Sequence, residues 1–472
     1  MIQRPAIMTS SSLLKGPQFA VILFAVAVYP ALAAISPVLR SSIPGIIILS
    51  FLVLLCGLVA VLDRSGDLFS PIRIVSAYYV SAFCIGPLLL VDYGWYHVAK
   101  ISSLFEFASG YALICYLLIL MGYALPSIFG GANSAAPNRS PLELTGRFFM
   151  MGLAVFSIGT LSYAVLVVRA GGINGLFNSE LARGQFFHGI GVFFWGAHFM
   201  IPGSILMFAS RARRARSLTW LWMAPVLLTF LLFIALQGRM RALIAPAVSL
   251  IIGHYLIRPI RLKRLAAIAI GVMIFTTFVG YARSPSVRFE LLRNPLSLVS
   301  EVAHGFPDYL MTAANADFQR LRSVMLVSDM VPKYMPHDWG SSLIAFLNPV
   351  MRILGLEERD AIGPRLFMLA FPEKEGGQSG LLPSMLGEML VNFPWPLTLG
   401  AYVLYGWWLR WIYRHLIENE TSRIKITTYA VLILYSANMI LHSFTQALFE
   451  LAIVLIPIGM TIFLAPFFRI QR

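Results

Sequence analysis

Long runs of apolar residues recur along the whole chain, and they constrain the fold more than any other feature. Each run of 18 or more residues is long enough to cross the hydrocarbon core of a bilayer, roughly 30 Å, as a helix. Backbone N–H and C=O groups inside lipid must pair within their own segment, so helices are the expected conformation. With 58% hydrophobic and 12% charged residues, the chain is predicted to be an all-α polytopic membrane protein.

About twelve membrane-spanning helices are predicted, in one membrane domain over residues 1–472. The predicted spans are 18–35, 43–62, 72–91, 107–125, 148–168, 190–209, 218–236, 241–257, 265–282, 394–413, 427–445 and 449–468. The first run ends in a stretch similar to a signal-peptidase site, so a cleaved signal peptide is the alternative to a first span. The three cysteines, Cys56, Cys84 and Cys115, lie inside such runs and are expected to be apolar packing residues.

The basic residues orient these spans. With the N-terminus in the cytoplasm, inner segments collect 20 of the 36 Lys and Arg residues, and the short outer loops hold only six. Positive residues favour the cytoplasmic side, so both termini are predicted to be cytoplasmic. The net charge of +15 then lies on the inner face. It indicates contact with anionic lipid and argues against nucleic acid as a partner.

The long segment between the ninth and tenth spans, residues 283–393, is therefore predicted to be extracytoplasmic. It holds 12 of the 21 carboxylates and ten basic residues in an otherwise apolar chain. Apolar residues at helical spacing over 314–331 predict an amphipathic helix that lies on the membrane or caps a site. This segment is where we expect the chemistry.

Cations outside this segment are candidates for binding an anionic substrate. Arg239 and Arg241 flank a predicted helix start on the side that the positive-inside rule disfavours. A helix N-terminus favours anions and the guanidinium matches phosphate oxygens, so the pair predicts a phosphate site. The alternative is that both side chains snorkel to lipid headgroups. Arg183 lies in a glycine-containing outer loop that suits a short interfacial helix or an ordinary re-entry loop.

Two carboxylates are candidates for acid–base chemistry. Glu388 stands just before the tenth predicted span among apolar neighbours, where a carboxylate tends towards a raised pKa and a functional role. The alternative is an interfacial ion pair with an arginine. Asp338 lies in the turn Pro336–Gly340 and could equally be a structural cap. No phosphate-binding loop or metal-ligand motif is found, so neither ATP hydrolysis nor a metal or other cofactor is expected.

Several stretches together resemble the bacterial oligosaccharide repeat-unit polymerases, the Wzy-type O-antigen polymerases. They are Gly238-Arg239-Met-Arg241-Ala-Leu-Ile, the Gly-Gly-Ile-Asn loop that leads to Arg183, Trp339-Gly340-Ser-Ser followed by Pro349 and Arg352, and Pro383 to Gly387-Glu388 and Asn392-Phe393. The resemblance implies a membrane fold related to the C-type glycosyltransferases. It also implies that undecaprenyl-pyrophosphate-linked glycans are joined at the outer face of the inner membrane.

The predicted roles follow from the residues together with this resemblance. Glu388 or Asp338 is expected to be the base for the acceptor hydroxyl, and Arg239, Arg241, Arg183, Arg352, Arg320 and Trp339 are expected to bind substrate. The expected partners are the lipid-linked glycans, membrane lipids and a chain-length regulator protein. An O-antigen ligase with the same lipid donor, and a lipid-linked oligosaccharide flippase, are the alternatives.

Overall fold

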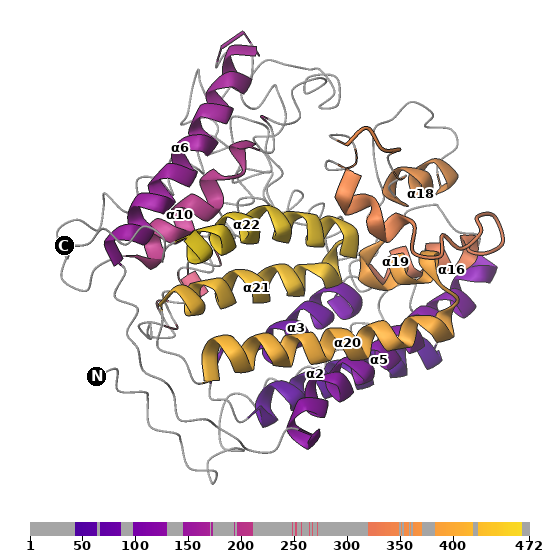
Figure 1. Cartoon of the computed structure of the whole chain (residues 1–472). Helices are drawn as coiled ribbons and strands as arrows, with labels where there is room; N and C mark the ends of the chain where they lie inside the picture. Colours follow the sequence, from indigo (N-terminus) through magenta and orange to yellow (C-terminus); the bar gives the residue numbers. More distant parts are fainter. Residues whose placement is uncertain are drawn as a thin grey trace, which may run out of the picture. The chain divides into compact units, whose positions relative to one another are not determined.

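The structure is a computed structural model, shown in Figure 1. It describes residues 43–63, 67–85, 98–129, 145–169, 171–172, 193, 196–210, 248, 251–252, 256, 264, 267, 271, 320–348, 351, 354–357, 359, 362–370, 383–418 and 423–464. All regular elements among these residues are helices, with no strand. In chain order they are α2 (Ile43–Leu62), α3 (Pro71–Tyr79), the π-helix η3 (Val80–Ile85), α5 (Val98–Phe129), α6 (Thr145–Arg169), α10 (Met200–Ala209), α16 (Arg320–Met330), the 3₁₀-helix η4 (Ser342–Leu347), α18 (Ile362–Ala370), α19 (Ser384–Asn392), α20 (Trp395–Tyr413), the π-helix η6 (Arg414–Glu418), α21 (Arg423–Leu441) and α22 (Phe444–Leu464).

The chain forms two compact units. Unit 1 comprises Met1–Asn133, Met311–Tyr413 and Ser436–Leu448, and unit 2 comprises Ser134–Leu310, Arg414–Tyr435 and Phe449–Arg472. Both units draw on distant parts of the sequence. The single membrane domain over residues 1–472, with a long periplasmic loop at 283–393, stays a prediction.

Five of the described helices are long and apolar enough to cross a membrane. The candidate spans are Ile43–Ala60, Ser102–Pro126, Phe148–Arg169, Ile424–Leu441 and Phe444–Thr461. They correspond in order to the second, fourth, fifth, eleventh and twelfth predicted spans, and they confirm the prediction of a helical membrane protein. The total of twelve spans and the orientation stay predictions.

Helix α20 coincides with the tenth predicted span, 394–413, although it is not one of the five candidates. It is rich in Trp and Tyr and contains Arg410, and these residues lower its mean hydropathy. Its exposed apolar side chains nevertheless include Leu397, Leu404 and Trp411, which follow one another at intervals of seven residues. A stripe of this kind on one helix face is typical of a surface that meets lipid.

Helices α5 and α20 lie side by side in unit 1 (Figure 1), and two glycines allow their backbones to approach closely. A Cβ atom added to Gly122 would overlap the carbonyl oxygen of Val403, and one added to Gly406 would overlap that of Ile119. Small residues at such crossings are a common device for packing helices in membranes. The close approach of the two helices therefore depends on both glycines.

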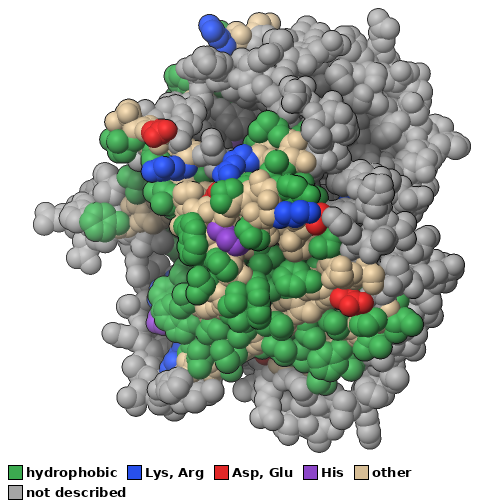
Figure 2. All heavy atoms as spheres, turned by 90° about the vertical axis from the view of Figure 1, so that its right-hand side faces the viewer, with side chains coloured by type: hydrophobic (Ala, Val, Ile, Leu, Met, Phe, Trp, Pro, Cys, Tyr) green, Lys and Arg blue, Asp and Glu red, His purple; other side chains and the backbone are tan. Residues whose placement is uncertain are grey.

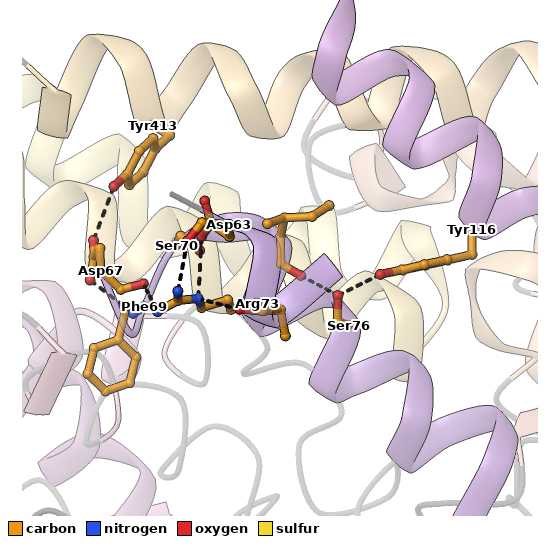
Figure 3. Close-up of polar contacts among 10 residues, drawn as sticks. Asp63, Asp67, Phe69, Ser70, Arg73, Ser76, Tyr116 and Tyr413 are labelled. Atoms are coloured by element: carbon orange, nitrogen blue, oxygen red, sulfur yellow. Dashed lines mark hydrogen bonds and ion pairs between the residues drawn. The ribbon is translucent and has the colours of Figure 1, made fainter. Parts of the chain in front are cut away.

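A polar corner joins α2 to α3 in the same unit (Figure 3). The Arg73 guanidinium donates to the main-chain carbonyl oxygens of Ala60, Asp63 and Asp67 at 3.0, 2.9 and 3.0 Å, and its Nε lies 3.4 Å from the Asp63 carboxylate. The Tyr413 hydroxyl donates to Asp67 Oδ2 at 3.4 Å. One arginine thus satisfies carbonyl groups at the end of α2, and a tyrosine connects the corner to the end of α20.

Helix α16 is the described part of the amphipathic helix predicted over 314–331. Nine of its eleven residues are buried, and it packs against α5 and α19. It therefore does not lie on the membrane surface with one face in solvent, and this part of the prediction is wrong. Side chains on every face of α16 meet protein, so the helix is an internal support for its neighbours.

In unit 2, α6 packs against α10 through glycines on both helices. A Cβ added to Gly159 would lie 2.5 Å from the Met200 nitrogen, and one added to Gly203 would lie 2.6 Å from the Phe156 nitrogen. The three cysteines, Cys56, Cys84 and Cys115, are in unit 1, where they are buried and unbridged. Their prediction as packing residues is confirmed.

Candidate functional site

The polar side chains of helix α19 include Glu388 and Asn392, which lie one turn apart, although all nine of its residues are buried. The helix ends at Asn392 because Phe393 is extended (φ −139°, ψ 149°) and Pro394 follows, which disfavours a helical residue before it. Asn392 Nδ2 donates to the Glu388 main-chain oxygen at 2.8 Å. Both polar groups are thus held on a short helix inside unit 1.

The Glu388 carboxylate meets the N-terminus of α22. The Thr445 N–H lies 3.2 Å from Oε2 and 3.4 Å from Oε1, and the Thr445 hydroxyl contacts Oε1. The first N–H groups of a helix have no partner within it, and the helix dipole favours a negative charge there. The proposed interfacial ion pair is not needed to explain how Glu388 is held.

The turn between α21 and α22 creates this arrangement. Helix α21 ends at Leu441, four residues before the predicted end of the span 427–445, and α22 begins at Phe444. Ser443 Oγ accepts a hydrogen bond from the Gln446 N–H at 3.1 Å. Ser-x-x-Gln is an N-terminal capping pattern, so the sequence does contain a signal for this helix start, which the apolar run conceals.

Burial dominates the electrostatics of Glu388, whose exposed fraction is only 1%. Burial raises the pKa of this carboxyl to about 7, whereas hydrogen bonds from the Thr445 hydroxyl, the Thr445 N–H and the Phe444 N–H act to lower it. As a carboxylate, Glu388 accepts from both groups of Thr445. As a neutral acid, it can donate to Thr445 Oγ1, whose own proton then turns to the Ser342 carbonyl oxygen, 3.3 Å away. Both protonation states therefore have partners.

A turn formed by residues 337–342 covers the C-terminal end of α19. The N–H groups of Asp338 and Trp339 donate to the carbonyl oxygens of Val391 and Asn392 at 3.0 and 2.9 Å. The Asn392 side-chain oxygen accepts from the Gly340 N–H at 3.0 Å and from the Ser342 hydroxyl at 2.9 Å. Asn392 therefore joins the turn to the helix that carries Glu388, and it satisfies polar groups that would otherwise be buried without partners.

The indole of Trp339 points outward from this turn. Its backbone has φ +49°, a left-handed conformation that a bulky residue seldom adopts, and its exposed fraction is 66%. The rings of His337 and Phe393 lie edge-on to it, with centroids 6.2 and 6.5 Å away. Backbone strain that presents an exposed aromatic side chain favours a binding role.

Asp338 is engaged by an arginine of α18. Nη1 of Arg365 lies 3.0 and 3.1 Å from its two carboxylate oxygens, and the Asp338 side chain is only 7% exposed. This contact ties α18 to the turn that covers α19. The geometry favours the structural alternative for Asp338 and leaves Glu388 as the stronger candidate for a base.

Arg320 also approaches the α21–α22 turn. It begins the described part of α16, is 4% exposed, and has Nη2 3.5 Å from Nδ1 of His442. His442 immediately precedes the Ser443 cap of α22. A buried cation and the buried Glu388 carboxyl thus both meet this one turn, Arg320 through His442 and Glu388 through Thr445.

The structure therefore brings four of the predicted site residues to α19 and its neighbours, namely Glu388, Asp338, Trp339 and Arg320. The other four, Arg183, Arg239, Arg241 and Arg352, lie outside the described residues. Sequence reasoning assigned no role to the residues that hold the site together, which are Ser342, Arg365, Asn392, His442 and Thr445. Ser342 and Asn392 fell within stretches on which the resemblance rests, and Thr445 lies between the two residues of the Ser443–Gln446 capping pattern. Arg365 and His442 carried no local signal.

The described residues include no group of three or more His, Cys, Asp or Glu that could hold a metal ion. Their arrangement is that of a buried carboxyl at the N-terminus of α22, with a buried arginine on the turn before that helix and a strained, exposed tryptophan at the C-terminal end of α19. Comparisons of the chain with family models, curated proteins and solved structures found no match. The described part thus defines a helical membrane protein with a buried polar centre.

Proposed function

We propose that the chain is a metal-independent glycosyltransferase that polymerises undecaprenyl-pyrophosphate-linked oligosaccharide repeat units. In this proposal it acts at the periplasmic face of the bacterial inner membrane, with both termini in the cytoplasm. The product is O-antigen or a related surface polysaccharide, whose length a separate regulator protein would control.

The observation that carries the proposal is the meeting of two stretches on which the resemblance rests. Trp339-Gly340-Ser-Ser and Gly387-Glu388 to Asn392-Phe393 are about 50 residues apart in the sequence, yet Asn392 accepts hydrogen bonds from the first stretch at 2.9–3.0 Å. Residues that share one site in an enzyme have to converge in this way. The meeting point lies beside Glu388, whose pKa of about 7 suits a general base near neutral pH.

In the proposed reaction, the acceptor hydroxyl oxygen bonds to the anomeric carbon of the growing chain. The bond from that carbon to pyrophosphate breaks, and undecaprenyl pyrophosphate leaves. Pyrophosphate is already a good leaving group, so the protein needs to position the two sugars and stabilise charge. Arg239 and Arg241 would bind the pyrophosphate, assisted by Arg183, Arg352 and Arg320, and Trp339 would stack on a sugar ring.

The proton of the acceptor hydroxyl passes to Glu388 through Thr445. Glu388 is buried, whereas Thr445 is partly exposed and its hydroxyl contacts Oε1. The Thr445 hydroxyl can give its proton to Glu388 while it accepts the proton of the acceptor. A buried carboxylate can in this way serve a substrate that does not touch it.

A deletion mutant tests the proposal. Lipid A-core with a single repeat unit identifies a polymerase. Core without any repeat identifies a ligase, repeats retained on the cytoplasmic side identify a flippase, and either result overturns the proposal. Complementation with Glu388→Gln should fail to restore polymer, because loss of a general base costs about 10²–10⁴-fold in rate. Glu357→Gln, at an exposed carboxylate, is the matched control and should restore it.

A second test concerns the pyrophosphate site. Replacing Arg239 or Arg241 with Lys keeps the charge but removes the planar fork that matches phosphate oxygens. Polymer length and rate should fall substantially while the amount of membrane protein is unchanged. Full-length polymer from both Lys variants would exclude these arginines as the pyrophosphate site.

A further inference from the structure

The described residues between 333 and 369 expose far more large apolar side chains than a water-facing loop would. We refer to residues 333–348, 351, 354–357, 359 and 362–369 together as the cap. It exposes six aliphatic or thioether side chains by between 38% and 65% of their surface: Ile344, Leu347, Leu354, Leu356, Met368 and Leu369. Exposed apolar side chains gathered on one segment indicate a surface that binds something.

Polar contacts join the parts of the cap to one another. Asn348 at the end of η4 exchanges two hydrogen bonds with the backbone of Arg359, at 2.7 and 2.9 Å. Arg365 on α18 binds Asp338 in the turn that covers α19. Helix α18 packs Ile362 and Leu366 against the protein. Its exposed residues Met368 and Leu369 therefore form a second apolar surface, which no packing among the described residues accounts for. The exposed residues thus belong to a connected structure.

The helices of the cap are too short to cross a membrane. Helix α18 has nine residues and η4 has six, so α18 spans about 14 Å at 1.5 Å per residue and η4 about 12 Å at 2.0 Å per residue. The hydrocarbon core of a bilayer is about 30 Å thick. An apolar surface on such short elements can meet lipid only by lying in the membrane–water interface.

Basic and aromatic residues border these apolar side chains, as is usual at that interface. Lys333, Arg359 and Arg365 belong to the cap, and Lys333 Nζ lies over the ring of Tyr334, 4.5 Å from its centroid. Figure 2 shows the face of the molecule on which α16, α18 and α19 lie at the right of Figure 1. On this face, separate Lys and Arg side chains, with Asp and Glu side chains among them, lie above a broad field of hydrophobic side chains.

The apolar surface also continues towards α20, whose exposed apolar stripe is typical of a surface that meets lipid. The Trp339 ring contacts Phe393, and the exposed side chains of Trp395 and Leu397 follow at the start of α20. From there the exposed stripe of α20 runs along the helix. We propose that the cap lies in the membrane–water interface, with its exposed apolar side chains among lipid acyl chains and its exposed basic residues Lys333 and Arg359 at lipid phosphates.

Single cysteines carrying a bimane fluorophore test this placement in full-length protein reconstituted into vesicles of phosphatidylcholine and phosphatidylglycerol. Cysteine replaces Met368 or Leu347, two apolar residues of the cap, and the exposed carboxylate residue Glu357 of the same cap is the polar control. The native cysteines Cys56, Cys84 and Cys115 are buried, so unsubstituted protein reports background labelling. Lipids with a nitroxide near the headgroup and aqueous iodide are the two quenchers.

We expect nitroxide lipid to quench positions 368 and 347 at least about two-fold more than position 357, because interfacial elements insert about 5–10 Å into the boundary of headgroups and acyl chains. Iodide should show the reverse order. Strong iodide quenching at 368 and 347 would overturn the proposal. Protection from both quenchers would also overturn it, since protein would then cover the cap. If that protection disappears on dilution of the protein in lipid, the covering partner is a second copy.

Discussion

Replacing Glu388 with Gln should make the protein more stable above neutral pH, although the residue is buried and hydrogen-bonded. The protonated acid and the amide have nearly the same shape and offer Thr445 the same donor and acceptor. The amide, however, never carries the charge that is costly to bury at this site. If Glu388 is kept for its proton, the neutral analogue should be stable and inactive.

The magnitude follows from the pKa. Burial raises it from the ordinary 4.5 to about 7, so the folded state holds the proton more tightly than the unfolded state. Below about pH 4.5 both states are protonated and the folded protein carries no penalty from Glu388. Stability then falls as the pH rises to 7, where the loss reaches about 3 kcal/mol at about 1.4 kcal/mol per pKa unit. Above pH 7 the loss is complete.

Thermal unfolding in detergent at pH 5 and pH 8, followed by tryptophan fluorescence, measures this difference. At pH 8, Glu388→Gln should raise the unfolding midpoint by a few degrees, as expected from about 3 kcal/mol in a chain of this size. At pH 5 the variant and the unsubstituted protein should differ little. Other groups titrate over the same range, so the quantity to compare is the variant minus the unsubstituted protein at each pH. Glu357→Gln, at an exposed carboxylate, should show no such pH-dependent difference.

One result would refute this reasoning. If Glu388→Gln lowers the unfolding midpoint at pH 8, the charged carboxylate stabilises the N-terminus of α22 by more than its burial costs. A negative charge at a helix N-terminus can contribute up to about 2 kcal/mol in partly buried sites. Glu388 would then be a structural cap, and the proposed proton transfer would lose its acceptor.

Three further predictions concern the neighbours of Glu388 and the helix packing. Thr445→Val should abolish polymer synthesis in cells and Thr445→Ser should retain it, because only serine keeps the hydroxyl that contacts Glu388; equal activity of the two variants would exclude the relay. Asn392→Ala should cost about 1–3 kcal/mol for each buried donor left unpaired and increase hydrogen exchange at Gly340, and unchanged exchange would contradict this role. Gly406→Ala should lower the yield of folded protein because its Cβ overlaps a carbonyl oxygen on α5, whereas Gly400→Ala meets no atom within 4 Å and should not.

The membrane character of the fold could be predicted from the sequence because lipid leaves the backbone few options. Helix α2 has the predicted bounds 43–62, and α6 extends the predicted span 148–168 by only a few residues. Hydropathy alone, however, does not reveal the turn after Leu441. Residues 427–445 form one apolar run, so hydropathy extended the span over a turn that the Ser443 cap marks.

The interior of the predicted loop could not be derived in this way. Apolar spacing correctly predicted a helix at α16, but the same spacing suits a helix on a membrane and one enclosed by protein. Its buried Arg320 and Arg322 show which of the two holds, since arginine side chains on a surface helix would extend into water or headgroups. The tertiary contacts that enclose a helix cannot be predicted from the sequence of that helix alone.

Some residues of the candidate site could be predicted from the sequence, and others could not. Glu388 could be selected because a carboxylate among apolar residues is costly wherever it lies. Asn392 was marked only by the resemblance, and Arg365 and His442 not at all, since each acts through a residue about 25 to 120 positions away in the sequence. Their residue types are ordinary, and only the fold assigns them partners.

The cost of keeping Glu388 is itself an argument about its role. Glutamine at this position would offer Thr445 the same hydrogen bonds and would carry no buried charge at high pH. Selection for stability alone would therefore favour glutamine over glutamate. A carboxyl whose burial raises its pKa, and which therefore lowers stability as the pH rises, is expected where a proton has to be bound and released. Its link to a partly exposed hydroxyl gives that proton a route, which a purely structural cap would not require. The activity of Thr445→Val and the stability of Glu388→Gln therefore test the same hypothesis independently. It holds only if the first variant is inactive and the second is more stable at pH 8.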